Sequence, residues 1–373
     1  MTLSSAQTRI RDWLFRQALP LWAEAGIDAE GRFFETLDFD GRPITGRPRR
    51  TRVQARQVYV FAEAAALGWI EGEAVAQRGL DALIRDNRRP DSNEWDGLWV
   101  RATDDAGVVI DATPDLYDLA FVLFALAAAH RTLKDDRARP LALETLAAIE
   151  ARMADPVHGG WQEALPPVLP RRQNPHMHML EALLAWQAVA PDPAFEGAAR
   201  RVLDLFATRF FDPSAAVLGE YFAADWAIAP GGAGQVVEPG HHMEWIWLLD
   251  QARRLGLDGH DRQAEALFAS ALTNGVGAQG LMIREIDRIG VVRDGGRRLW
   301  GQTEALRTLW LRGRSDRARS LLDAVFATHL ATATPGLWVD AYDAEGRPQD
   351  ASVPASTFYH LMTAFSALLT EPA

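Results

Sequence analysis

Apolar residues recur at helical spacing along most of the chain, in segments that follow one another in pairs. The first segment of each pair is apolar on almost every side, as in LYDLAFVLFALAAA from residue 116, whereas the second carries more charge. A helix that is apolar all round is buried on both sides, so we expect the first helix of each pair to lie inside the second. Three such pairs are 53–67 with 75–86, 116–130 with 137–153, and 179–189 with 194–210.

Six short stretches, each opening on a glycine, separate these helix pairs. They alternate apolar and polar residues and then carry turn dipeptides such as Asp40-Gly41 and Glu345-Gly346, which predicts short β-hairpins. The glycines are Gly31, Gly97, Gly160, Gly219, Gly280 and Gly336, at successive intervals of 66, 63, 59, 61 and 56 residues. That interval accommodates two helices with their connections and is longer than the common solenoid repeats.

Six buried helices inside six amphipathic ones predict an all-α fold, the (α/α)6 barrel, with the hairpins between helix pairs at one mouth. Because the repeat runs from near residue 31 to near residue 360, no position is left for a domain boundary. We therefore expect a single catalytic domain over residues 1–373.

A chemically capable residue follows each glycine by 18 to 24 positions. In chain order these residues are Arg52, Tyr117 with Asp118, His178, His241, Trp300 with Gln302, and His360. Residues at one phase of a closed repeat lie in one layer, so we expect them to converge on a central pocket between the helices. A lone histidine beside an apolar helix is more often a structural residue, but three histidines in register favour a site.

An acidic residue follows two of these histidines at the third position, Glu181 after His178 and Glu244 after His241. This spacing puts both members of a pair on one helical face, where a carboxylate can orient an imidazole and fix its tautomer. The alternative is a glutamate that satisfies the start of a helix in a capping box. For Glu181 the two interpretations stay open.

Neighbouring histidines raise the question of a metal. His176 precedes His178 by two positions and His242 follows His241 directly, but such positions diverge on a helix. The sequence holds no HExxH or comparable ligand spacing, and it has no cysteine. We expect neither a metal nor a cofactor, with His176 and His242 as packing residues.

Aromatic and basic residues near the same layer suggest a sugar. The chain has 13 tryptophans, and Trp99 and Trp300 fall near the expected pocket, where indole rings stack on sugar rings; core filling is the alternative. Arginine pairs precede three of the phase positions and are either a basic rim for an anionic substrate or solvated loop charges. They are Arg49-Arg50, Arg171-Arg172 and Arg297-Arg298.

Charge and hydropathy limit the partners. The formal net charge of −11, from 39 Lys and Arg against 50 Asp and Glu, argues against nucleic acid. The longest apolar run, 119–129, is too short to span a bilayer, and the first residues carry charges at helical spacing and no signal-peptide core. We expect a cytoplasmic monomer or homodimer whose partner is a small monosaccharide, with no membrane partner.

Five segments resemble the N-acylglucosamine 2-epimerase superfamily, which includes aldose–ketose isomerases and cellobiose 2-epimerases. They are TRVQARQVYVFAEAAALGW, NPHMHMLEALLAW, PGHHMEW, RLWGQTEALRTLW and STFYHL. The resemblance implies a pocket arginine at Arg52 and a glutamate at Glu244, with histidines at His178, His241 and His360. Around this catalytic set we expect Tyr117, Asp118, Glu181, Trp300, Gln302 and Trp99 to bind the substrate.

The chemistry agrees with this resemblance, because removing a proton beside a sugar carbonyl requires a base that works near neutral pH. We expect His241 to serve ring opening, His360 to move the C2 proton to C1 through an enediolate, and Arg52 to stabilise the charged oxygen. The chain length and the QTEALR segment resemble the mannose isomerase branch of the superfamily, and this resemblance implies a sugar isomerase of the mannose–fructose type.

Three alternatives stay open. A 2-epimerase would use His241 and His360 as two bases. A glycoside hydrolase would need two suitably spaced carboxylates. A noncatalytic sugar-binding barrel would need neither such carboxylates nor histidine bases. The sequence does not distinguish a free sugar from a phosphorylated or sulfonated one.

Overall fold

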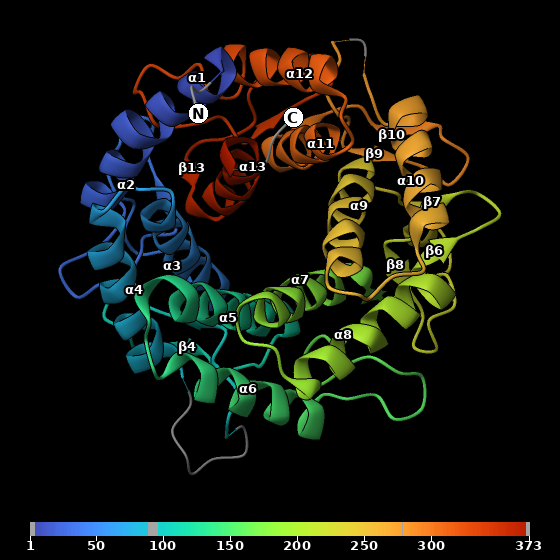
Figure 1. The fold of residues 1–373 in the computed structure, drawn as a ribbon, viewed down its shortest axis with the longest axis horizontal. Helices are drawn as coiled ribbons and strands as arrows, with labels where there is room; N and C mark the ends of the chain where they lie inside the picture. The colour runs from blue at the N-terminus through green and yellow to red at the C-terminus, as the bar shows by residue number, and fades with distance from the viewer. Residues whose placement is uncertain (1–3, 89–95, 278, 371–373) are drawn as a thin grey trace.

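Two concentric rings of helices make up the computed structural model, which describes residues 4–88, 96–277 and 279–370 (Figure 1). The inner ring consists of α3 (Thr51–Ala66), α5 (Leu116–Ala128), α7 (Gln173–Val189), α9 (Pro239–Arg254), α11 (Leu299–Leu311) and α13 (Phe358–Thr370). Each inner helix contacts the next, and α13 closes the ring against α3. The predicted (α/α)6 barrel is confirmed.

The outer ring carries one partner for each inner helix. It consists of α1 (Ser5–Trp13) with α2 (Leu19–Ala25), α4 (Glu71–Asn87), α6 (Ala138–Arg152), α8 (Pro193–Leu205), α10 (Asp261–Asn274) and α12 (Ser315–Ala327). The π-helical turns Leu14–Ala18, Ala129–Leu133 and Phe206–Phe210 extend α1, α5 and α8.

The composition of the inner helices follows from their place. Helix α5 is capped by Asp115, whose side chain accepts hydrogen bonds from the backbone N–H groups of Tyr117 and Asp118, and almost all of the helix is buried. With its π-helical extension it spans Leu116–Leu133, long and apolar enough by length and composition to cross a membrane, yet 67% of that window is buried. Since α5 packs against α3, α6 and α7, its apolar character belongs to the barrel core.

Short strands join the elements at one mouth. The strand before an inner helix pairs antiparallel with the strand after the outer helix of the same pair, in β2 (Arg49–Arg50) with β3 (Ala102–Thr103), β5 (Arg171–Arg172) with β8 (Tyr221–Phe222), β11 (Arg297–Arg298) with β12 (Ala341–Tyr342), and β13 (Val353–Pro354) with β1 (Thr36–Leu37). Single bridges, Asp115 with Ala164 and Val237 with Ile286, do the same in the other two repeats. This pairing ties both ends of each helix pair together.

Among the described residues, the predicted local hairpins form ladders in two repeats, β3 with β4 (Val109–Asp111) and β9 (Glu285–Ile286) with β10 (Val292–Asp294). Single local bridges replace them in three others, Leu37 with Pro43, Phe222 with Ile228 and Tyr342 with Pro348. A further hairpin, β6 (Phe211–Asp212) with β7 (Val217–Leu218), lies before Gly219. Alternation along the chain predicts a strand but says nothing of its partner, so the pairing across each helix pair was not predicted.

The repeated glycine marks a left-handed backbone turn. Six equivalent positions have a positive φ, namely Gly31, Gly97, Gly159, Ala216, Gly280 and Gly336. Two of the glycines chosen from the sequence are therefore displaced, Gly160 by one residue and Gly219 by three, because Ala216 occupies the turn in the fourth repeat. A Cβ on Gly31 would lie 2.5 Å from the backbone oxygen of Arg78 in α4, so this turn also lets the loop approach the next outer helix.

Candidate active site

A cavity of about 190 Å³ lies at the mouth where the N-terminal ends of the inner helices meet. It is lined by Arg56, Tyr117, Asn174, His178, Glu238, His241, Glu244, Arg298, Trp300, Ser356, Thr357 and His360. These residues come from the first two turns of the six inner helices or from the segments just before them. Because a helix N-terminus carries partial positive charge, this arrangement favours an anionic intermediate in the cavity.

The cavity gathers six residues that the sequence pattern selected, which are Tyr117, His178, His241, Glu244, Trp300 and His360. The indole of Trp300 packs against both the His241 ring, at 4.8 Å between centroids, and the His360 ring, at 5.9 Å. Histidines far apart in the sequence therefore share one wall, on either side of an aromatic face that suits a sugar ring.

Arg52 does not line the cavity, which corrects its expected role. Its Nε lies 2.8 Å from Asp118 Oδ1, and its backbone N–H donates to the same oxygen. Asp118 is buried in this pair and is not a lining residue either. Burial raises the pKa of Asp118 to about 7, although Arg52 acts in the opposite direction.

The arginine of the cavity is Arg56, one helical turn further along α3. Its Nη2 donates to the Tyr117 hydroxyl at 2.7 Å and its Nη1 donates to the Ser356 carbonyl at 3.2 Å. Both partners also line the cavity, so the guanidinium is held at its wall.

The displacement has a simple origin, because the residues that line the cavity come from two layers of the repeat. The first residue of five inner segments donates its backbone N–H to the strand of the same pair, at Thr51, Leu116, Gln173, Leu299 and Ala355. One residue later come Arg52, Tyr117, Asn174, Trp300 and Ser356, and five residues later come Arg56, Phe121, His178, Glu304 and His360. Counting from the glycines mixed these two layers, which are one helical turn apart.

Gln302 and Trp99 are structural, in contrast to their predicted contact with substrate. The Gln302 side chain accepts from the backbone N–H of Met282 and donates to its carbonyl, both at 2.8 Å. Gln54, His176 and His242 hold the equivalent loops in other repeats. Trp99 is buried in the core and donates to Thr145 Oγ1.

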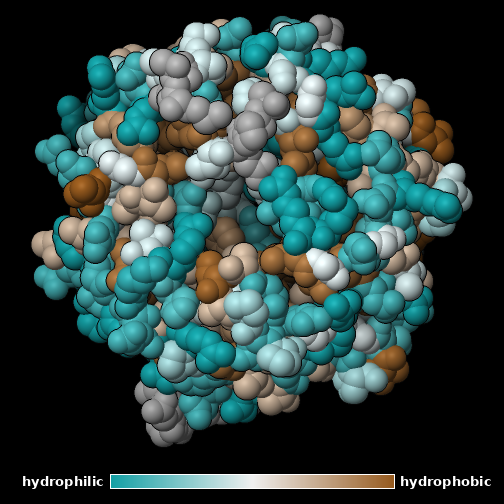
Figure 2. Space-filling view, viewed as in Figure 1, coloured by the Kyte–Doolittle hydropathy of each residue, from teal (hydrophilic) through white to brown (hydrophobic). Residues whose placement is uncertain are grey.

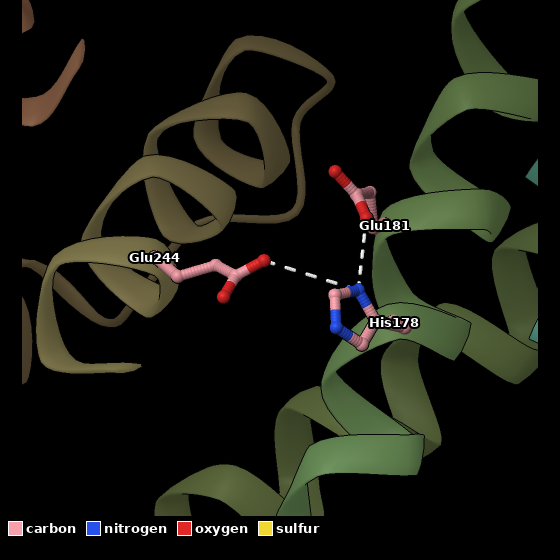
Figure 3. Close-up of side chains that lie close together, drawn as sticks. All are labelled: His178, Glu181 and Glu244. Atoms are coloured by element: carbon pink, nitrogen blue, oxygen red, sulfur yellow. Dashed lines mark hydrogen bonds and ion pairs between the residues drawn. The ribbon is translucent and has the colours of Figure 1, made fainter. Parts of the chain in front are cut away.

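Two carboxylates surround His178 (Figure 3). Its Nδ1 lies 3.1 Å from Glu181 Oε2, one turn along α7, and 3.8 Å from Glu244 Oε1 on α9. Glu181 also accepts a hydrogen bond from Tyr359. The carboxylate places the proton on Nδ1 and leaves Nε2 as the acceptor, so Glu181 orients an imidazole and does not cap the helix.

Burial lowers the pKa of His178 to about 4, although Glu181 acts in the opposite direction. Glu244, expected to orient His241, lies instead beside His178 and within 3.9 Å of Arg307. Burial raises the pKa of Glu244 well above its ordinary value, and the carboxylate of Glu304 adds to this rise. A protonated Glu244 can donate to a sugar hydroxyl.

His241 is oriented by Glu220, which the sequence analysis missed. Nδ1 of His241 lies 3.0 Å from both carboxylate oxygens of Glu220. Burial alone lowers the pKa of His241, but Glu220 and Glu238 outweigh burial and raise it to about 10. The imidazole is therefore positively charged at neutral pH. Nε2 lies 3.3 Å from the Asn174 side chain.

A repeat signal marks Glu220 in retrospect. Glu35, Glu163, Glu220 and Asp340 all offer a backbone carbonyl to the start of an inner helix, so they are equivalent acidic positions in four repeats. All four lie within the glycine stretches, before the inner helices that carry most of the predicted site residues.

His360 is neutral at neutral pH, unlike the positively charged His241. Its Nδ1 lies 2.8 Å from Glu304 Oε1, and Glu304 is in turn paired with Arg307. Burial lowers the pKa of His360 well below its ordinary value, and the nearby Arg56 guanidinium adds to this effect. With Nδ1 donating to Glu304, Nε2 of a neutral His360 is free to accept a proton.

The arginine pairs are neither a uniform basic rim nor solvated charges. Arg49 and Arg171 are buried in ion pairs with Asp28 and Asp155. Arg298 lines the cavity but gives Nη2 and Nε to one Asp340 oxygen, at 2.6 and 3.1 Å. The charge of Arg298 is therefore already compensated.

Three groups of side chains could hold an ion by distance alone. Within the described ranges they are His178 with Glu181 and Glu244, Glu220 with Glu238 and His241, and Glu244 with Glu304 and His360. Each contains an imidazole whose Nδ1 is within hydrogen-bonding distance of a carboxylate, so a proton accounts for the close approach in every group. Independence of metal stays a prediction.

A second cavity, of about 360 Å³, lies between the C-terminal ends of the inner helices. The face of the molecule in Figure 2 is hollowed at the centre of the ring. Apolar side chains such as Phe124 and Leu184 form most of the wall of this second cavity, and Glu181 and Arg307 form part of its polar wall. Glu181, the partner of His178, and Arg307, the partner of Glu304, therefore lie between this cavity and the smaller one.

The geometry agrees with the sequence family. The model of the N-acylglucosamine 2-epimerase (GlcNAc 2-epimerase) family matches residues 32–364. The chain belongs to this family. An N-acylglucosamine 2-epimerase family member of this kind is an isomerase or epimerase acting on sugars, which sets aside the hydrolase and noncatalytic alternatives.

Two relatives that are more than 30% identical in sequence are named as isomerases. A mannose-6-phosphate isomerase of Rhizobium meliloti (strain 1021) is 37% identical over 374 residues, which cover 95% of each chain. A D-mannose isomerase of Thermobifida fusca is 31% identical over 298 residues, 75% of this chain and 72% of that one. Among solved structures, a cellobiose 2-epimerase from Bacillus thermoamylovorans B4167 superposes with a TM-score of 0.88 over 98% of this chain and 99% of that one, at 19% identity, and so shares the fold.

Proposed function

We propose that this protein is an aldose–ketose isomerase of the mannose–fructose type that works without a cofactor. The observation that carries the proposal is a pair of histidines in opposite states at one cavity. His360 is held neutral beside Glu304, while Glu220 holds His241 as an imidazolium. One is suited to accept a proton and the other to donate one.

The proposed reaction starts from the open-chain aldose. Nε2 of His360 removes the proton from C2, and the electron pair forms the C1=C2 bond of an enediolate while negative charge develops on O1. The Arg56 guanidinium and the helix N-termini stabilise that charge. The O2–H proton then passes to O1, O2 becomes the ketone oxygen, and His360 returns its proton to C1.

The protonation states favour isomerisation over 2-epimerisation. An epimerase that removes the C2 proton with His360 and delivers another from His241 on the opposite face ends with the proton on His360 and none on His241. Since the pKa of His360 lies far below that of His241, this exchange costs about 1.4 kcal/mol for each pKa unit between them. An isomerase ends with both histidines as they began.

Mannose and fructose are the sugars of this proposal. The name of the Thermobifida fusca relative and a cavity of about 190 Å³ with mostly polar walls support free mannose, whereas the name of the Rhizobium meliloti relative supports the mannose skeleton in its 6-phosphate form. A free monosaccharide in the cytoplasm is the proposed substrate, and the proposed assembly is a monomer or homodimer.

A sugar panel tests the proposal. Purified protein is incubated separately with mannose, glucose, lyxose, fructose and mannose 6-phosphate, and the products are separated by chromatography. We expect fructose from mannose and mannose from fructose. Conversion of mannose to glucose without fructose would instead identify a 2-epimerase.

A further inference from the structure

One carboxylate of the cavity, Glu238, has no part in the reaction described above. We propose that Glu238 is the base that takes the proton from the anomeric hydroxyl during ring opening, while His241 is the acid that protonates the ring oxygen. The inference rests on the proposed isomerase function, and it concerns the step that precedes proton transfer from C2.

The position of Glu238 supports this role. It is the residue before α9, and its backbone carbonyl accepts the N–H of His241 at 3.0 Å, so the first helical turn fixes the two residues relative to each other. One carboxylate oxygen of Glu238, one of Glu220 and a ring nitrogen of His241 all lie within 4.8 Å of one another. Glu238 and His241 both line the cavity, whereas Glu220 lies behind His241.

The Glu238 carboxylate is also unengaged. It makes no capping hydrogen bond to α9, and the interactions found within residues 4–88, 96–277 and 279–370 include no hydrogen bond or ion pair to it. Glu181, Glu220 and Glu304 each hold a histidine. Glu244, the other acidic residue of the cavity wall, lies beside His178 and Arg307, and burial raises its pKa well above the ordinary value, which favours its protonated form.

Ring opening needs an acid and a base together, and His241 supplies only the acid. With a pKa of about 10 it already carries its proton at neutral pH. Burial raises the pKa of Glu238 to about 7, with His241 opposing the rise and Glu220 adding to it. Glu285, Arg284, Tyr221 and Arg298 also act on Glu238 through their charges. A carboxylate that titrates near neutral pH is matched to general base catalysis.

The step balances in atoms and charge. The O1–H bond breaks and its proton passes to a Glu238 oxygen, while the O1 electron pair forms the C1=O1 bond. The C1–O5 bond breaks, and O5 takes the proton from Nε2 of His241. Glu238 is then neutral and His241 uncharged, and proton transfer from Glu238 to His241 restores both residues for the next turnover.

Ring opening can be measured apart from isomerisation, because it interconverts the α and β anomers. The test uses His360→Asn, in which C2 proton removal is blocked, and follows anomer exchange of mannose by NMR exchange spectroscopy. We expect His360→Asn to accelerate this exchange as wild type does. Adding Glu238→Gln should lower the protein-catalysed rate of anomer exchange by roughly 10²–10⁴, the usual contribution of a positioned acid or base.

Two further variants make the result specific. Glu285→Gln is the matched control, since Glu285 is a nearby carboxylate that does not line the cavity, and it should leave anomer exchange unchanged. Glu238→Asp should recover part of the activity that Glu238→Gln loses, which a merely structural role would not require.

The possible outcomes separate a failure of the role of Glu238 from a failure of the proposed function. Unchanged anomer exchange in the Glu238→Gln variant, or no acceleration by wild type while it still isomerises mannose, would overturn the role of Glu238. Equal losses in Glu238→Gln and Glu285→Gln would do the same. If wild type converts no sugar of the panel, the proposed function fails instead, whatever the anomer exchange shows.

Discussion

Three histidines of one cavity differ because each meets a different set of charges. His178 and His360 each donate Nδ1–H to one carboxylate, Glu181 or Glu304, whose charge is shared with Tyr359 or Arg307. His241 meets both oxygens of Glu220 and the carboxylate of Glu238. The same side chain thus serves as base or as acid according to its neighbours.

His360→Asn is expected to lower kcat/KM for mannose by roughly 10²–10⁴, because it removes the base that moves the C2 proton. Exchange of that proton with deuterated water, followed by NMR, should vanish with it. His241→Asn should lose less on sugars with a larger open-chain fraction. Equal loss of exchange in both variants on every sugar would mean that the two histidines act as paired bases.

Arg56→Lys is expected to act mainly on kcat, because lysine keeps the charge but lacks the planar guanidinium that is held by Tyr117 and Ser356. Arg52→Ala should instead act on folding. It leaves buried Asp118 without its partner, which costs about 3–5 kcal/mol in the free energy of unfolding. Steady-state kinetics and urea unfolding of both variants separate the two roles, and a reversal would show that Arg52 is the arginine of the site.

Much of the site could be predicted at this scale, and the remainder has identifiable causes. The histidines, Tyr117 and Trp300 were predicted because each follows a repeated glycine at a similar spacing, and Glu244 because it follows His241 at the third position. Arg56 and Glu304 were missed because the spacing selected Arg52 and Trp300 in their repeats, which lie one helical turn earlier on the same inner helices. Glu220 and Glu238 were missed because they lie outside the inner helices, on segments whose pairing depends on distant strands.

At the scale of elements, the hydrophobic pattern predicted which helices are inner and which are outer. The segment 75–86 lies within α4, and 137–153 exceeds α6 by one residue at either end. The spacing of apolar residues shows whether a helix is buried on every side or on one face, and this difference separates the inner ring from the outer ring. Strand partners were not predicted, because a strand of two residues carries no register of its own.

The turns between elements offer a test with an internal control. Gly31 and Gly46 both have a positive φ, of 86° and 75°, but a Cβ on Gly31 would meet the backbone of Arg78, whereas one on Gly46 would meet nothing within 4 Å. Gly46→Ala should lower the free energy of unfolding by about 1–2 kcal/mol, the cost of the left-handed conformation alone. Gly31→Ala should cost clearly more in urea unfolding, and equal costs would show that the close approach to α4 is unimportant.

At the scale of the whole molecule, the ring is closed by residues from both ends of the sequence. Helix α13 packs against α3 and α1, and β13 pairs with β1. The six inner N-termini can therefore face one cavity, which no single repeat could form.

The protein is expected to work without a bound metal. Activity should survive exhaustive dialysis against EDTA, because protons account for the carboxylate–imidazole contacts of all three candidate groups. Elemental analysis of the active protein checks this directly. A stoichiometric metal, with activity that returns only on its re-addition, would contradict the expectation.

The central claim is that His360 carries a proton between C2 and C1 of one sugar. The most direct measurement is to incubate the protein with mannose in deuterated water and follow position and isotope by NMR. We predict that fructose forms, with solvent deuterium at C1 in the fraction that exchanges on His360. Glucose carrying deuterium at C2, formed without fructose, would contradict the account.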